Sequence, residues 1–257
     1  MNPSTSTLLA SAPPEQHKAY WRRRLSQPPP PPNLPWDHER PPVPSFVRAS
    51  VSAQIGPGVW QEAQRMAQAA GTTPHVALLA ALYALLFRYT GQGDLILGTA
   101  VAPSLGEPLQ GASGSPELIA LRMRVIGAMT ARDLLDELAV SLGEATQNLP
   151  MASGDVLALP GPQSGSAGHI PFNVALILSE PPISGNGRSW RESAFEAHLR
   201  ACALVIRAHA AAGGLTLSCD FDSDLLEAPT VRRLAGHFTN LLADIAARPD
   251  TNLDHLA

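Results

Sequence analysis

Cysteine and long apolar runs are scarce in this 257-residue sequence. The two cysteines, Cys202 and Cys219, cannot build a disulfide framework, and without CxxC or mixed Cys/His spacing they predict buried thiols. The longest apolar run, Val76–Phe87, is too short to span a bilayer, and the first residues lack a basic segment ahead of an apolar core. We therefore expect a cytoplasmic protein with no metal and no membrane partner.

Positive charge is also limited. The only lysine is Lys18, and a net charge of -4 leaves no strongly basic surface, so nucleic acid is not an expected partner. The one basic run, Arg22–Arg24, is better explained as a solvated helix face than as a phosphate site. A hydrophobic fraction of 45% and a charged fraction of 16% instead favour a globular protein with a real core.

Proline divides the chain into three parts. Residues 1–14 read as a disordered leader, residues 15–45 as a short helix and a proline-rich connector, and residues 46–257 as the main domain. The run Pro28–Pro32 must be extended, because proline lacks the N–H that a helix or a ladder needs. A stiff connector along the domain surface is the favoured interpretation, and a ligand for a proline-reading module is the alternative.

The main domain alternates between strand-like and helix-like segments. Thr73 and Pro74 mark one helix start, and Thr130 with Asp133 resembles a capping box at another. The predicted helices are Glu15–Leu25, Gly58–Ala70, His75–Tyr89, Ala131–Thr146 and Thr230–Ala247. The predicted strands are Phe46–Ala53, Asp94–Ala100, Leu118–Val125, Phe172–Leu178, Phe195–Leu199, Cys202–Ala208 and Leu215–Asp222, with a loop at residues 152–168 and a turn at Ser184–Arg188. This order predicts an α/β or α+β sandwich, not a doubly wound parallel sheet.

Five segments, in order, resemble the C-terminal half of a nonribosomal peptide synthetase condensation domain. AYWRRRL followed by LPWDHERPP (Leu34–Pro42) resembles the entry to that half, and GTTPHVALLAALYALLFRYTGQGDLILGTAVA (Gly71–Ala102) is the most specific match. The others are TQNLPM (Thr146–Met151), IPFNVALIL (Ile170–Leu178) and the segment Phe221–Leu256. The resemblance implies a chloramphenicol acetyltransferase-like half-domain, a mixed sheet with helices packed on one face.

The same resemblance identifies what the chain lacks. Condensation domains resemble acyltransferases in which an HHxxxDG motif of the other lobe assists an amine attacking a carrier-bound thioester. This sequence has no HH dipeptide. Glu117 stands where the family pattern has Asn, and the arginines that usually precede the segment at Ile170 have no equivalents. These losses imply a lobe that no longer lines a substrate tunnel.

Residual catalysis has one weak candidate, His169, acting with Asp220 or Asp222. No Ser or Cys nucleophile signature accompanies that set, so no catalytic residue is assigned. His75 and His237 lie in helical patterns among apolar neighbours, which favours a packing role for both.

The leading hypothesis is a noncatalytic, truncated condensation-type domain that serves as a docking platform in nonribosomal peptide biosynthesis. Its partners would be carrier or adenylation domains of the synthetase, a trans-acting tailoring enzyme such as an oxygenase, or a second copy of the chain as a homodimer. No cofactor is expected beyond contact with a phosphopantetheine-loaded carrier protein. The alternative is the C-terminal half of a split enzyme that a separate HHxxxDG lobe completes, forming amides or esters. A third alternative is a fragment of a larger synthetase.

Partner-binding residues are predicted from size and position. Trp21, Trp36 and Trp190 are large side chains near loops that would suit anchors, although ordinary packing explains each of them too. An exposed face made of Asp94–Ala100 and the loop Met151–Ile170 is the expected contact region.

Overall fold

The structure is a computed structural model that describes residues 14–43, 45, 47–101, 117–149, 170–179, 194–211 and 213–256. Within these residues, six strands form one sheet in the order β1-β6-β5-β4-β2-β3. The pairs β2–β4 and β4–β5 are parallel and the other three are antiparallel, so the predicted mixed sheet is confirmed. The strands are β1 (Arg48–Ile55), β2 (Asp94–Val101), β3 (Glu117–Arg124), β4 (Val174–Ser179), β5 (Leu204–Ala211) and β6 (Gly214–Asp222).

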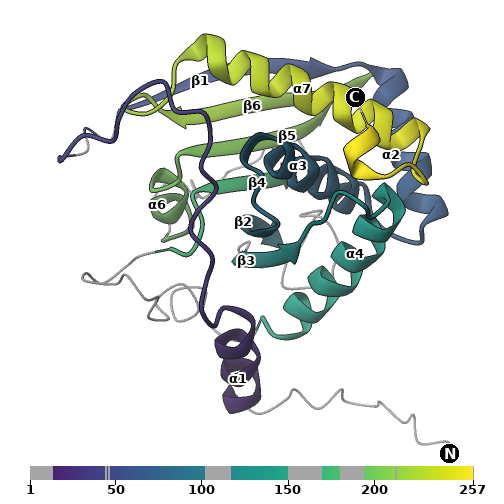
Figure 1. Ribbon diagram of the computed structural model, residues 1–257, viewed down its shortest axis with the longest axis horizontal. Coiled ribbons are helices and arrows are strands. Elements are labelled where there is room, and N and C mark those ends of the chain that lie inside the picture. Colours follow the sequence, from purple (N-terminus) through teal and green to yellow (C-terminus); the bar gives the residue numbers. More distant parts are fainter. Residues whose placement is uncertain are drawn as a thin grey trace, which may run out of the picture.

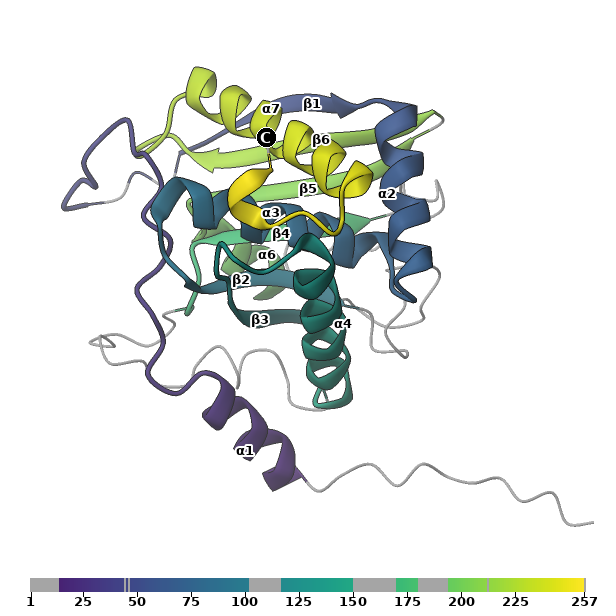
Figure 2. The same cartoon turned by 45° about the vertical axis from the view of Figure 1, so that its right-hand side comes forward.

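Four helices cover one face of the sheet, as predicted from the resemblance (Figures 1 and 2). They are α2 (Pro57–Ala69), α3 (Pro74–Thr90), α4 (Ala131–Gln147) and α7 (Ala228–Ala247), and a short 3₁₀ turn, Leu253–His255, follows the last. α3 packs against α2, α4 and α7, and its residues from His75 to Leu86 are all buried. Among the described residues no single helix has the length and hydropathy of a membrane span, although α2 and α3 would together, bent by 106°.

Local sequence signals explain where two of these helices begin and end. Thr130 and Asp133 form the predicted capping box, in which Asp133 N–H donates to Thr130 Oγ1 at 3.1 Å and Thr130 N–H donates to Asp133 Oδ2 at 2.8 Å. α3 starts with Pro74 in its first turn and stops at Gly91, whose φ of 68° lies in the left-handed region that glycine adopts without strain.

The second face of the sheet is divided into two halves. Apolar side chains of β3, β2 and β4 form a cluster with Phe172 and with Leu199 of the helix α6 (Ala194–Arg200). The side chains of β1 and β6 on this face are polar, and Ser50 Oγ lies 3.2 Å from Ser218 Oγ. Gly98 lets the Phe172 ring lie against the sheet, because a Cβ at this position would come within 2.3 Å of the ring. This apolar half is a second, smaller core.

The proline-rich connector lies along one end of the sheet, from α1 (Pro14–Arg24) to the start of α7 (Figure 1). Gln92 Nε2 donates to Pro30 O at 3.3 Å, and Gln92 Oε1 accepts from Asn33 N at 2.8 Å. Further along, the Asp37 carboxylate accepts from Glu227 N and from Thr230 Oγ1, both at 2.8 Å. Asp37 thus supplies the N-terminal cap that α7 lacks from its own sequence.

Two sequence predictions are wrong. Residues Phe195–Leu199 belong to α6 and not to a strand, because a helix directs Leu199 to the second core while Glu196 reaches Arg207, 2.9 Å away. The segment Asp94–Ala100 is not an exposed face, because β2 lies inside the sheet and every residue from Leu95 onward is buried.

The remaining elements agree with their predicted positions within about three residues. The predicted loop at 152–168, the turn at Ser184–Arg188 and the leader up to residue 13 lie outside the described residues. Cys202 and Cys219 are buried free thiols, as predicted. They belong to different cores on opposite faces of the sheet, so their side chains point apart and cannot form a disulfide without movement of the backbone.

Candidate functional site

The predicted site residues are scattered over the structure. His169 and Trp190 lie outside the described residues, so the structure does not test a pairing of His169 with Asp220 or Asp222. Asp220 Oδ2 accepts from Arg207 Nε at 3.0 Å. No group of three or more potential metal ligands occurs in the described part of the chain.

The two histidines assigned to packing have neutral hydrogen-bonding partners. His75 is 5% exposed and its Nε2 lies 2.8 Å from Thr99 Oγ1, where burial lowers its pKa to about 4. His237 Nδ1 lies 2.6 Å from Tyr89 Oη at the surface. Within the described ranges, neither histidine has a carboxylate partner of the kind that orients a catalytic base.

The other two tryptophans have different environments. Trp21 is 1% exposed, and its indole Nε1 donates to Asn148 O at 3.0 Å. Its ring therefore packs inside the protein and is not available as an anchor for a partner. Trp36 is half-buried, and its Nε1 donates to Asn33 Oδ1 at 3.0 Å. Part of the Trp36 ring remains accessible on the connector.

α1 is attached to the domain at the C-terminal end of α4. Besides the Trp21 bond, His17 Nδ1 lies 3.1 Å from Asn148 Oδ1, and Asn148 Nδ2 donates to Glu144 O at 2.8 Å. The Tyr20 ring stands edge-on to Trp21 with their centroids 5.0 Å apart. Burial raises the pKa of Tyr20. Two segments that carry the family resemblance, AYWRRRL and TQNLPM, thus lie in direct contact.

Two arginines fasten α1 to β3. Arg24 donates to the carbonyl oxygen of Arg122 at 3.0 Å and to the buried hydroxyl of Ser141. In return, Arg122 NH1 donates to the carbonyl oxygens of Arg24, at 3.3 Å, and Ser26, at 2.8 Å. Arg122 also forms a two-point ion pair with Asp94, with distances of 2.9 and 2.6 Å. That bond holds the pKa of Asp94 below its usual range.

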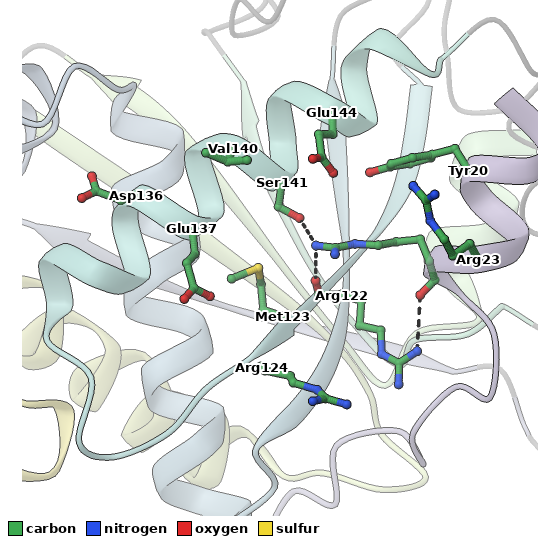
Figure 3. A pocket seen from close by; sticks show the side chains of 11 residues that line it. Tyr20, Arg23, Arg122, Met123, Arg124, Asp136, Glu137, Val140, Ser141 and Glu144 are labelled. Carbon is green, nitrogen blue, oxygen red and sulfur yellow. Dashed lines mark hydrogen bonds between the residues drawn. The ribbon is translucent and has the colours of Figure 1, made fainter. Parts of the chain in front are cut away.

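A groove of about 670 Å³ lies between α1, β3 and α4 (Figure 3). Arg23 and Arg124 line the side formed by α1 and β3, while Asp136, Glu137 and Glu144 line the side formed by α4. All five side chains are exposed, and none forms an ion pair with the described residues. Opposite charges thus face one groove without neutralising each other.

An apolar side chain stands between these charges. Val140 is 64% exposed on α4, and Figure 3 shows it between Glu137 and Glu144. Val140 is thus an exposed apolar residue beside acidic side chains that form no ion pair within the part of the chain that the structure describes.

Comparison with known proteins places this fold. The family model of the condensation domain matches residues 4–257. This chain belongs to the condensation domain family. Among curated relatives, bacitracin synthase 1 of Bacillus licheniformis is 28% identical over 228 residues, which cover 87% of this chain and 4% of the synthase. Surfactin synthase subunit 1 of Bacillus subtilis (strain 168) is 30% identical over 222 residues, covering 83% of this chain and 6% of the subunit.

Solved structures share the same fold. The X-domain from teicoplanin biosynthesis, in its complex with OxyB, has a TM-score of 0.75 at 21% identity and covers 95% of this chain. The condensation domain of the monacolin K polyketide synthase MokA has a TM-score of 0.72 at 20% identity and covers 93% of this chain. This condensation-family chain spans 55% of that X-domain chain and 59% of that MokA chain, so it corresponds to little more than half of either.

The groove escaped sequence reasoning, although its parts were visible. AYWRRRL and TQNLPM are both family segments, but nothing in the sequence of this condensation-family chain indicates that Trp21 and Asn148 are in contact. Ser141 and Arg122, which bind Arg24 beside the groove, belong to no recognisable sequence motif. The sequence carries one signal, in α4, where Val140 places an apolar side chain on the polar face of an amphipathic helix, the face that also carries Asp136 and Glu137.

Proposed function

We propose that this condensation-family chain is a noncatalytic docking module of nonribosomal peptide biosynthesis, and that the groove between α1, β3 and α4 is its partner-binding surface. The observation that carries the proposal is a set of exposed charges near Val140 that form no ion pair among the described residues, in a chain whose sequence has no HHxxxDG motif. Without that motif, the group that must lie within reach of the attacking amine is missing.

The groove is suited to a folded partner with complementary charge. Glu137 and Glu144 are seven residues apart, which places them on one face of α4, two helical turns from each other. Arg124 lies across the groove from them on β3. A partner that inserts between the walls would carry basic groups toward α4 and acidic groups toward β3. Such pairs of opposite charge across an interface govern the orientation and the association rate of a complex more than they govern its affinity.

The class of partner follows from the family. Condensation domains work beside carrier and adenylation domains, and one solved neighbour is an X-domain in complex with OxyB. We extend this by analogy to a carrier or adenylation domain, or to a trans-acting tailoring enzyme, as the partner of this chain. A carrier protein would present its phosphopantetheine arm without this chain holding a cofactor of its own.

Charge reversal tests the proposal. Carrier domains, adenylation domains and tailoring oxygenases encoded beside this chain are titrated against it by isothermal calorimetry. The double variant Glu137→Arg/Glu144→Arg should weaken binding of the true partner by about tenfold or more. Glu39→Arg is the control on the connector: it makes the same change of charge as either groove substitution alone, and it should leave the affinity unchanged, whereas Glu137→Arg alone should weaken binding. Binding that survives reversal in the groove, or no binding by any of these proteins, refutes the proposal.

A split enzyme is the second candidate. It is favoured by the length of the chain, which covers little more than half of the solved domains that it matches. A separate HHxxxDG lobe would then have to associate with it. Mixing the two chains with carrier-loaded donor and acceptor substrates should produce amide or ester, detected by mass spectrometry, and a His→Ala change in the second His of that motif should abolish the product. Product formation would exclude the noncatalytic role.

A further inference from the structure

The two edge strands of the sheet differ in how they are protected. β3 carries Glu117, Arg122 and Arg124, and Arg24 of α1 donates to the carbonyl oxygen of Arg122, so charge and a side-chain cap both guard this edge. Exposed edges need such protection, because unpaired backbone groups are a template for another strand. β1, the opposite edge, has one charged residue in eight, Arg48. Figures 1 and 2 show it at the outer margin of the sheet.

Even Arg48 does not guard the edge. Its guanidinium donates to the carbonyl oxygens of Arg200 at 3.2 Å, Cys202 at 2.6 Å and Asp220 at 2.8 Å. These three acceptors lie on the inner side of β1, on or beyond β6, so the charge is held toward the sheet. The rest of the strand has no proline and no charge, two of the features that commonly prevent edge-to-edge pairing.

The register shows which backbone groups of β1 point outward. Ser223 N donates to Val47 O at 3.1 Å, whereas Asp222 N, opposite Arg48, donates to Ala203 O at 2.9 Å, on the other side of β6. Odd-numbered residues of β1 therefore bond to β6. Because antiparallel ladders alternate, the N–H and C=O groups of Arg48, Ser50, Ser52 and Gln54 point to the open edge. In the described part of the chain, nothing is bonded to these groups.

We infer that this edge pairs antiparallel with β1 of a second copy of the chain, giving a two-fold dimer with one continuous sheet. Pairing the outward groups with each other sets Arg48 opposite Gln54 of the second copy and Ser50 opposite its Ser52. Val51 then faces its own symmetry mate on the two-fold axis. This register uses every outward donor and acceptor, forming about eight hydrogen bonds.

The side chains of β1 are self-complementary in this register. On the helix-covered face, Val47 lies opposite Ile55 of the second copy, and Val47 is otherwise 59% exposed. On the other face, serine meets serine and arginine meets glutamine, so no like charges are opposed. A strand of another protein would need this same pattern, whereas a second copy supplies it by symmetry. The interface is small, so we expect a reversible dimer in the micromolar range.

A proline at an outward-pointing position of β1 distinguishes a dimer that forms through this edge from a dimer that forms through another surface. Ser52→Pro removes an N–H that points outward and leaves the ladder to β6 intact, so the variant should fold and sediment as a monomer. Wild type should approach twice the 27.1 kDa of one chain as its concentration rises in sedimentation velocity. Ser52→Thr is the matched control and should dimerise. Should the proline variant fail to fold, Ser52→Lys places charges near the axis and should also give monomers.

A cross-link tests the register. Val51→Cys places two sulfurs across a non-hydrogen-bonded pair on the axis, with the Cα distance that a disulfide requires, and oxidation should give a covalent dimer. Ser52→Cys, at the next position of the strand, is the control. In the proposed register the two copies of residue 52 lie diagonally across the interface, with Cα atoms about 7 Å or more apart, so this variant should not cross-link. A monomeric wild type at about 100 µM overturns the inference. So does a dimer that persists in both Ser52→Pro and Ser52→Lys, or a cross-link at position 52 and not at position 51.

Discussion

Acidification should destabilise this protein through His75 in particular. The imidazole is buried in α3, its Nε2 2.8 Å from Thr99 Oγ1, and the Thr99 hydroxyl in turn donates to Leu176 O at 2.8 Å. Because the single hydroxyl proton of Thr99 is donated to that carbonyl, His75 must donate its Nε2–H to the Thr99 oxygen. The hydrogen bond is compatible with either charge state of the ring, and it is burial that disfavours the protonated form. Burial lowers the pKa of His75 from 6.5 to about 4.

The direction and size of the effect follow from the two pKa values. Between pH 6.5 and 4 the unfolded chain protonates His75 and the folded chain does not, so stability falls as pH falls through this window. The contribution of the neutral, buried His75 to the free energy of unfolding is fully present above pH 6.5, and about 3 kcal/mol of it is lost by pH 4. Buried neutral histidines must charge on unfolding, and they thus contribute to acid denaturation.

Urea unfolding at pH 7 and pH 4 measures the effect, with His75→Gln as the comparison. Glutamine retains an N–H donor for Thr99 and has no proton to gain, so the variant should lose about 3 kcal/mol less than wild type on acidification. Carboxylates that titrate in the same window are common to both proteins and cancel in the difference. Equal pH dependence in the two proteins would refute the assignment of a buried, neutral His75.

Three further perturbations test the packing. Gly98→Ala should cost about 2 kcal/mol in urea unfolding, because its Cβ would overlap the Phe172 ring, and Phe172→Leu in the same chain should recover part of that loss. Asp37→Ala removes the cap of α7 and should cost about 1 kcal/mol, whereas Glu39→Ala nearby should change nothing measurable. Arg24→Met removes the bonds to β3 and Ser141, so hydrogen exchange of α1 should accelerate by about tenfold while that of the sheet is unchanged. Unchanged α1 exchange would mean that the remaining contacts, from Trp21, His17 and Arg122, are sufficient to hold the helix.

Local patterns in the sequence predicted most elements because their signals are short-range. The capping box at Thr130 and the Pro74 start of α3 depend only on residues within one turn, and both are present in the structure. α3 was recognisable as a buried helix from its uninterrupted apolar composition. The segment Leu215–Asp222, predicted as a strand, is β6, in which buried and partly exposed residues alternate.

Predictions failed where burial depends on a distant partner. AFEAHLR can be read as a strand or as a helix, and packing of Leu199 against the second core decides for the helix α6. The two tryptophans Trp21 and Trp36 look alike in sequence, since both lie near loops. Only docking of α1 on Asn148, 127 residues away, buries the first and leaves the second partly accessible.

The sequence by itself determined ancestry and the main elements, since ordered family segments and periodicity are written along the chain. It also determined the lack of an HHxxxDG motif. Only the tertiary structure decided where recognition would occur. The charges of α1, β3 and α4 meet in one groove, and β1 lies at an unguarded edge, because the sheet order brings together or exposes residues that are far apart in the sequence. Side-chain charge is a local property, but whether it is neutralised depends on what folding places opposite it.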